Sequence, residues 1–161
     1  MNETLDPKRA AAALMEALAA AFADMAFIDV GPIGSEARPR GGGSRPRDEG
    51  AGAKIRAAID VLRPLSCRIE IECPATLKAR IEETLFMGES GKEEDSLLEL
   101  LNVAAGLFLS AYFGPGTDIK LELPQYLFLS EGSEGDVLAE VEADAEGALL
   151  RAVLRTIRYR Y

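Results

Sequence analysis

The sequence EDSLLELLNVAAGLFLSAYFG, residues 94–114, predicts a long helix that packs against the rest of the protein on most of its sides. Leucine, valine, alanine and phenylalanine fill most of the helical wheel, and Gly114-Pro115-Gly116 ends the pattern. We expect the helix to run from about residue 91 to residue 113. A helix that is apolar nearly all round has to be covered by other elements.

Four residues of this helix form a narrow polar seam. An α-helix turns about 100° per residue, so Asp95, Glu99, Asn102 and Gly106 fall within about 60° of arc, and Ser110 extends the line. A glycine in the middle of a helix costs roughly 1 kcal/mol relative to alanine. The position of Gly106 on the seam therefore predicts that some other group, from this chain or a partner, approaches the helix closely there.

Two structural interpretations of the seam stay open at this point. Ser96-x-x-Glu99 has the pattern of a capping box, in which Glu99 would only satisfy the start of the helix. Ser90-x-x-Glu93 has the same pattern six residues earlier, and a helix that begins there leaves Glu99 free of that task. Asn102 could likewise be a buried amide that bonds to a neighbouring helix.

A carboxylate and a carboxamide three residues apart also suit a chemical role. Glu99 can pair with an ammonium group of a partner, and the amide of Asn102 can hold a water molecule through one donor and one acceptor. Hydrolysis of a phosphoryl group needs such placement of water, because its loose transition state leaves the protein little covalent work. No metal-ligand set, nucleophile dyad or phosphate-binding glycine loop is recognisable, so the metal would have to come from the substrate protein.

Composition narrows the classes of partner. A chain of 161 residues predicts one domain, here spanning 1–161, and its hydrophobic fraction of 48% is enough for an ordinary core. The net charge of −9 argues against nucleic acid and against anionic membranes as main partners. The chain has no histidine, which excludes catalysis and metal binding by that residue.

The N-terminal region and the cysteines predict a cytoplasmic protein. The first residues are acidic and do not resemble a signal peptide. The run Ala10–Phe27 is interrupted by Glu16 and Asp24, which makes it a poor membrane span. Cys67 and Cys73 share one face of one predicted strand and stand too far apart to bridge, so we expect buried free thiols.

The elements predicted along the chain repeat in the same order. Each half reads as a long helix, a strand, a loop and a hairpin, and a short helix over 75–87 joins the halves. The residues after 147 would also suit a helix, but the repeat favours a strand. The predicted elements are a helix over 7–26, a strand ending at Gly31-Pro32, a flexible Gly/Arg-rich loop over 36–53, a hairpin over 54–74, the helix over 91–113, a strand over 117–124 and a hairpin over 135–161.

This repeat predicts an α+β fold. We expect two pseudo-symmetric helix–strand–hairpin halves that form one antiparallel-rich sheet. The two long helices, over 7–26 and 91–113, should pack side by side on it.

The seam resembles the signature of a known family. Asp95-x-x-x-Glu99-x-x-Asn102 is similar to the [D/S]xxxExxN motif of the CheC/CheX/FliY chemotaxis phosphatases, and the repeated layout resembles that family over nearly the whole chain. A proline-bearing strand, IKLELPQYL with Pro124, follows at about the family's distance. The first helix has Glu16 but Ala19 three residues later, so the single remaining motif points to a CheX-like protein.

The resemblance implies a function and a partner. A CheX-like protein would hydrolyse the aspartyl phosphate of a response-regulator receiver domain such as CheY, with Asn102 orienting the attacking water and Glu99 engaging the receiver's lysine. Asp95 and Gly106 would belong to the partner-binding surface. Magnesium would be bound by the receiver, with no cofactor or metal in this chain, and the protein would form homodimers through its sheet.

Two other classes of function remain as alternatives. The same seam could dock a receiver without hydrolysis, as a binding module. The chain could instead be a structural subunit whose seam is buried against another protein.

Overall fold

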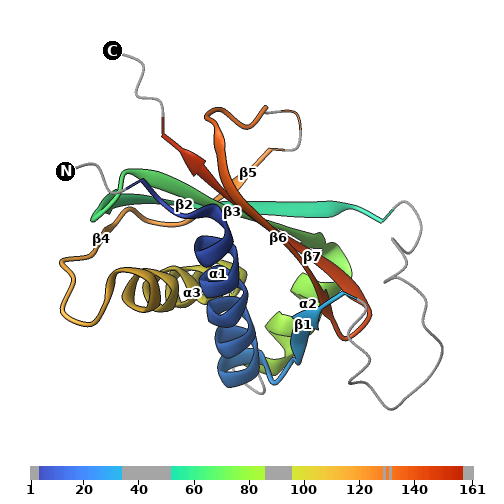
Figure 1. Ribbon diagram of the computed structural model, residues 1–161. Helices are drawn as coiled ribbons and strands as arrows, with labels where there is room; N and C mark the ends of the chain where they lie inside the picture. The colour runs from blue at the N-terminus through green and yellow to red at the C-terminus, as the bar shows by residue number, and fades with distance from the viewer. Residues whose placement is uncertain (1–3, 34–51, 86–95, 129, 131, 158–161) are drawn as a thin grey trace.

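The computed structural model describes residues 4–33, 52–85, 96–128, 130 and 132–157. Within these ranges the chain forms a seven-stranded sheet in which each observed pairing is antiparallel. The helices gather on one face of this sheet, as Figure 1 shows. The predicted α+β class is therefore confirmed.

The first half of the chain follows the predicted order. The predicted helix over 7–26 is continuous, but its last turn is a π-helix. The elements are α1 (Pro7–Ala21), the π-helix η1 (Phe22–Ala26), β1 (Val30–Pro32), β2 (Lys54–Arg63) and β3 (Cys67–Pro74). The loop predicted over 36–53 lies outside the described residues except for its last two positions.

The second half also follows the prediction, with one correction. The strand expected over 117–124 is wrong in extent, because β4 covers only part of it, with one further hydrogen bond from the N–H of Glu122 to the carbonyl of Asp60, and a further short strand, β5, follows Pro124. Proline has no N–H to donate to a ladder, which keeps Pro124 itself out of the pairing. The elements are α2 (Ala75–Leu85), α3 (Ser96–Phe113), β4 (Lys120–Leu121), β5 (Gln125–Leu127), β6 (Val137–Ala145) and β7 (Ala148–Thr156).

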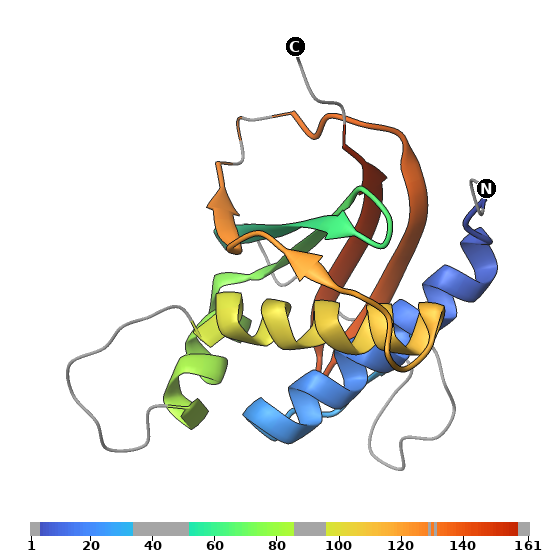
Figure 2. The ribbon, with the colours of Figure 1, turned by 90° about the vertical axis from the view of Figure 1, so that its left-hand side faces the viewer.

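The strand order carries the predicted pseudo-symmetry. The sheet runs β1-β6-β7-β3-β2-β4, and β5 also pairs with β2. If β1, β2 and β3 of the first half change places with β4, β6 and β7 of the second, in that order, the result is the same list read from its other end. The helices that begin the two halves, α1 and α3, pack against each other, as Figure 2 shows from the side.

The core lies between the sheet and these helices. The alternation in β3 places Cys67, Ile69, Ile71 and Cys73 in it, each about 1% exposed. Burial raises the pKa of both thiols to about 12, so they stay protonated at neutral pH. The predicted buried free thiols are confirmed.

A polar cluster ties the start of α1 to the end of α3. Asp6 caps α1 by accepting hydrogen bonds from the backbone N–H groups of Lys8 and Arg9. The N–H of Asp6 in turn donates to the hydroxyl of Tyr112 at 2.8 Å. The guanidinium of Arg9 donates to the carbonyl of Tyr112 at 2.8 Å and lies 4.6 Å from the centre of its ring. These contacts hold the two long helices in register.

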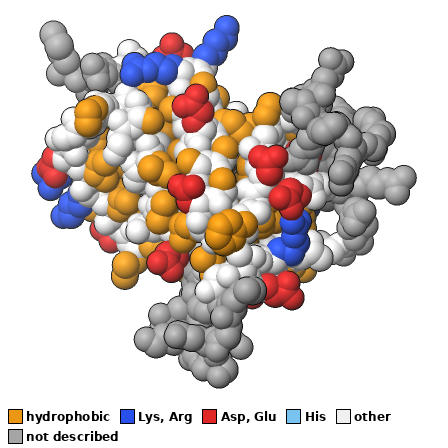
Figure 3. Space-filling model, turned by 90° about the horizontal axis from the view of Figure 1, so that it is seen from below, with side chains coloured by type: hydrophobic (Ala, Val, Ile, Leu, Met, Phe, Trp, Pro, Cys, Tyr) orange, Lys and Arg blue, Asp and Glu red, His pale blue; other side chains and the backbone are white. Residues whose placement is uncertain are grey.

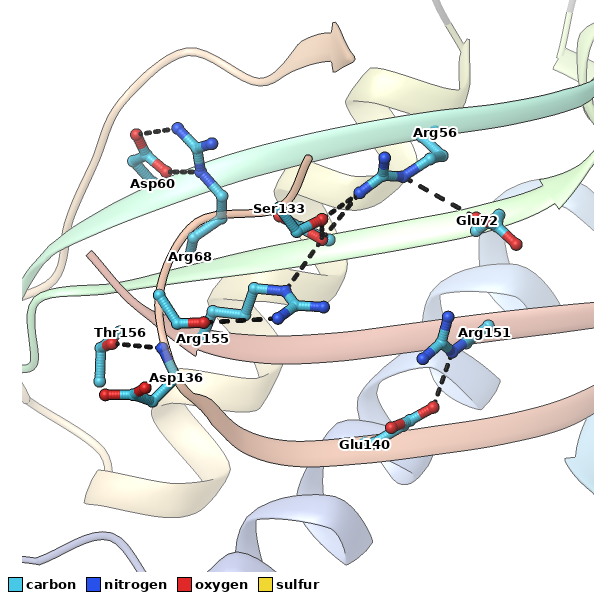
Figure 4. A network of polar contacts seen from close by, with 12 residues as sticks. Arg56, Asp60, Arg68, Glu72, Ser133, Asp136, Glu140, Arg151, Arg155 and Thr156 are labelled. Carbon is cyan, nitrogen blue, oxygen red and sulfur yellow. Dashed lines mark hydrogen bonds and ion pairs between the residues drawn. The ribbon is translucent and has the colours of Figure 1, made fainter. Parts of the chain in front are cut away.

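The face of the sheet that points away from the helices carries ion pairs (Figure 4). Glu70 is only 4% exposed, and its Oε2 accepts hydrogen bonds from Arg56, Ser133 and Arg155. Ser133 belongs to the connection between β5 and β6, which crosses this face of the sheet. Opposite charges therefore neutralise one another where the sheet has no helix over it.

The residue after η1 leads to a testable prediction. Phe27 has a left-handed backbone with φ of 52° and is 81% exposed, so its ring contributes little packing to offset the strain. Phe27→Gly is expected to raise the free energy of unfolding by about 0.5–1 kcal/mol, measured by urea denaturation. Ala23→Gly in η1, where the backbone is helical, should lower it by about 1 kcal/mol. A loss of stability in both variants would show that the ring of Phe27 packs usefully.

Candidate functional site

The candidate site is the exposed side of α3. The opposite side anchors the helix, since half of its residues are buried in the core. By length and composition α3 also passes the test for a membrane span, but that same half of it lies inside the fold. The buried residues are Ser96, Leu97, Leu100, Leu101, Ala104, Ala105, Phe108, Leu109 and Tyr112.

Glu99 and Asn102 both lie on the exposed side of this helix. Neither side chain makes a hydrogen bond or an ion pair to another described residue. Residues three apart on a helix have Cβ atoms about 5–6 Å from each other. A carboxylate and a carboxamide thus project together from a rigid support.

The exposure of these residues decides between the structural interpretations. Asn102 is exposed, so the alternative of a buried amide is wrong. Ser96 is buried and its hydroxyl has no hydrogen-bond partner, so it does not form a capping box with Glu99. Residues 91–95, where an earlier helix start was expected, lie outside the described residues, and so does Asp95.

Gly106 and Ser110 continue the seam towards the end of α3. Gly106 is partly exposed, and a Cβ built on it would meet nothing within 4 Å. The chain's own packing therefore does not require glycine at this position. The absence of a side chain here leaves bare backbone on the surface beside the two polar groups.

The exposed side of α3 is wider than the predicted seam. Val103 and Leu107 were expected to be packed like the other apolar residues, but they are 38% and 40% exposed. Each stands four residues after the one before it in the series Glu99, Val103, Leu107, so the three form a row beside the polar seam. The four-residue spacing was visible in the sequence, but not which row the neighbouring elements would leave uncovered.

A polar hollow lies on the helix-free face of the sheet. It has a volume of about 220 Å³ and is lined by side chains of the ion-pair network, among them Arg56, Arg151 and Arg155. The sheet separates it from α3, so it cannot share chemistry with Glu99 and Asn102. No group of three or more histidine, cysteine, aspartate or glutamate side chains that could hold a metal ion occurs in the part of the chain that the structure describes.

Comparisons with known proteins identify the fold. No protein-family model matches the sequence, and no curated protein matches it. Among solved structures, the chain is similar to the chemotaxis protein CheX from Desulfovibrio desulfuricans, with a TM-score of 0.65 and 13% identity over 90% of this chain and 97% of that one. It is also similar to CheX from Borrelia burgdorferi in a complex with CheY, BeF3 and Mg²⁺, with a TM-score of 0.56 and 16% identity over 89% and 95% of the two chains.

A third similar structure widens the group. FliY from Thermotoga maritima matches with a TM-score of 0.51 and 16% identity over 92% of this chain and 90% of that one. CheC-like proteins are among the similar structures as well. At these identities the likeness concerns the fold, and the resemblance predicted from the sequence is confirmed at that level.

Proposed function

We propose that this chain, which has the fold of the CheX, CheC-like and FliY chemotaxis proteins, hydrolyses the aspartyl phosphate of a CheY-like receiver domain. One observation carries the proposal: Glu99 and Asn102 stand together and exposed on a helix that the core holds rigid. The similarity to a CheX solved with CheY supports a receiver as the partner.

The proposed mechanism assigns one task to each side chain. Asn102 enters the phosphorylated pocket and holds a water molecule in line with the phosphorus, with its amide acting as donor and acceptor. Glu99 pairs with a lysine of the receiver, which sets the depth and direction of approach. Because the transition state is loose, correct placement of water provides most of what the phosphatase has to add.

Magnesium belongs to the receiver in this proposal. A divalent ion there neutralises charge on the phosphoryl oxygens. This chain contributes only the water-positioning amide and the carboxylate, both from one helix face. Asp95 would extend the docking surface at the start of that face.

The direct test is the lifetime of a phosphorylated receiver. Receiver domains of the source organism are phosphorylated with acetyl phosphate and Mg²⁺, the donor is removed, and release of inorganic phosphate is followed with and without this protein. Faster release at substoichiometric protein supports the phosphatase. Binding of the phosphorylated receiver with an unchanged lifetime would select the alternative, a binding module without catalysis.

Gly106 gives a prediction in which stability and activity change in opposite directions. Gly106→Ala should raise the free energy of unfolding by about 1 kcal/mol, because alanine is the better helix former and its Cβ meets no atom within 4 Å. If the receiver packs against this backbone, the added methyl group should raise KM for the phosphorylated receiver about tenfold. Thermal denaturation and steady-state phosphate release measure the two effects. An unchanged KM would show that no close approach occurs at Gly106.

The oligomeric state and the compartment complete the proposal. We infer a cytoplasmic homodimer that forms through the sheet. The helix-free face of the sheet carries charges that neutralise one another, as where the Nε of Arg151 donates to the Oε1 of Glu140 at 2.7 Å. Light scattering at several protein concentrations should give twice the chain mass of 17.3 kDa. A mass of one chain at all concentrations would remove the dimer from the proposal and leave the catalytic part intact.

A further inference from the structure

Exposed apolar side chains concentrate around the candidate site. Seven large apolar residues of the described chain are exposed to 36% or more, and five of them belong to α3 or to the segment of β4 and β5. Single exposed apolar residues are normal, but a group of them indicates an interaction surface. The five are Val103 at 38%, Leu107 at 40%, Leu123 at 88%, Tyr126 at 36% and Phe128 at 74%.

The topology places the segment of β4 and β5 along the sheet edge above α3. After α3, the chain reverses at Gly114 and Gly116, both with positive φ, and β4 then pairs with the end of β2. β5 pairs nearer to the start of β2, so the segment runs back along the sheet edge above α3 (Figure 2). β2 also contacts α3 directly.

The side chain of Tyr126 on β5 points to the side of the sheet that carries the helices. It stands opposite Ala57, whose side chain is buried in the core. Its ring also lies 5.6 Å from the Nζ of Lys78 on α2, and α2 contacts α3. Tyr126 therefore belongs to the helix-bearing side, where hydrophobic side chains cover much of the surface between scattered acidic groups and basic side chains lie mostly at the margins (Figure 3).

We propose that residues Leu123–Phe128 form a second docking element, which binds an apolar surface of the same receiver domain that Glu99 and Asn102 address. The proposal rests on the proposed function and adds a recognition surface to it. Two observations favour a receiver as the occupant: β4 and the start of β5 run along the sheet edge above α3 (Figure 2), and Val103 and Leu107 form an exposed apolar row beside Glu99 and the polar seam. A receiver whose lysine pairs with Glu99 brings its adjoining surface over these side chains.

The two parts of this surface have separate effects on the reaction. Leu123 and Phe128 are nearly bare in the free protein, so covering them contributes to binding whatever the state of the phosphoryl group. Such uniform binding lowers KM and leaves kcat unchanged. Asn102 acts only while water attacks and is expected to control kcat. The apolar element would thus choose the receiver, and Glu99 and Asn102 would carry out the chemistry.

The test compares Leu123→Ala and Phe128→Ala with Val137→Ala. Val137 is 50% exposed and lies on β6, towards the opposite end of the strand order, so it serves as the matched control. Affinity is measured by calorimetry for receiver domains of the source organism held in the active state by beryllofluoride and Mg²⁺, and kcat by phosphate release. Circular dichroism checks that each variant is folded. We expect all three to fold, because the replaced side chains are exposed.

The expected result is a Kd about tenfold weaker for each of the two variants, with kcat at saturation and the Val137→Ala affinity unchanged. This inference alone would be overturned if Leu123→Ala and Phe128→Ala bind the receiver as tightly as the unaltered protein does while Asn102→Ala still abolishes hydrolysis. If the unaltered protein binds no receiver, the proposed function itself is overturned, and the second docking element with it.

Discussion

Asn102→Ala is expected to lower the rate of receiver dephosphorylation by at least about 100-fold. The reason is positional: the amide is exposed on a rigid helix and, in the proposed mechanism, its donor and acceptor hold the attacking water. The same change should leave the fold intact and raise the free energy of unfolding by about 0.5 kcal/mol, because alanine is the better helix former. Phosphate release at saturating receiver and urea denaturation give the two numbers.

Ser110→Ala is the matched control for this variant. Ser110 is exposed on the same side of α3, about two turns further along, and has no role in the proposed chemistry. It should keep the full rate. If Asn102→Ala keeps the full rate, the proposed mechanism is wrong. If Asn102→Ala unfolds, the amide of Asn102 has a structural role instead.

Phe108→Ala is expected to destabilise the protein by about 3–5 kcal/mol. Phe108 is fully buried in the core, and its ring centre lies 5.9 Å from that of Tyr112. Truncation removes buried apolar surface and leaves a cavity that the two packed long helices cannot easily close. Chemical denaturation followed by circular dichroism measures the loss.

Leu107→Ala provides the comparison for Phe108→Ala. Leu107 is the preceding residue in the same helix, but it is 40% exposed, so its truncation should cost less than about 1 kcal/mol. The pair isolates burial from helix propensity, because both variants introduce alanine into α3. Equal losses in the two variants would mean that α3 does not sit in the core as described.

Several features of the fold could be predicted because they depend on local chemistry. Alternation of apolar and polar residues identified the hairpins, since side chains of a strand point to opposite faces. Asp6 and Pro7 marked the start of α1, because both suit the first turn of a helix. The strand predicted over 117–124 was too long, because β4 ends at Leu121, and the pairing at β5 after Pro124 was missed.

For the candidate site, too, part could be predicted from the sequence and part could not. Helical periodicity alone places Glu99 and Asn102 on one side of α3, and no tertiary contact is needed for that. Their exposure, by contrast, could not be read from the sequence: a capping box or a buried amide suited the same letters. The packing of α1 and the sheet against α3 decided the question by covering the opposite side.

The sequence by itself determined the element types, their repeated order and the common direction of Glu99 and Asn102, because backbone preferences and helical spacing act over a few residues. Only the tertiary structure decided which side of α3 meets solvent and that the segment of β4 and β5 runs back along the sheet edge above it. These outcomes depend on pairings between residues far apart in the chain, such as Ala57 with Tyr126. Burial is a property of what the rest of the chain covers, so no single segment specifies it.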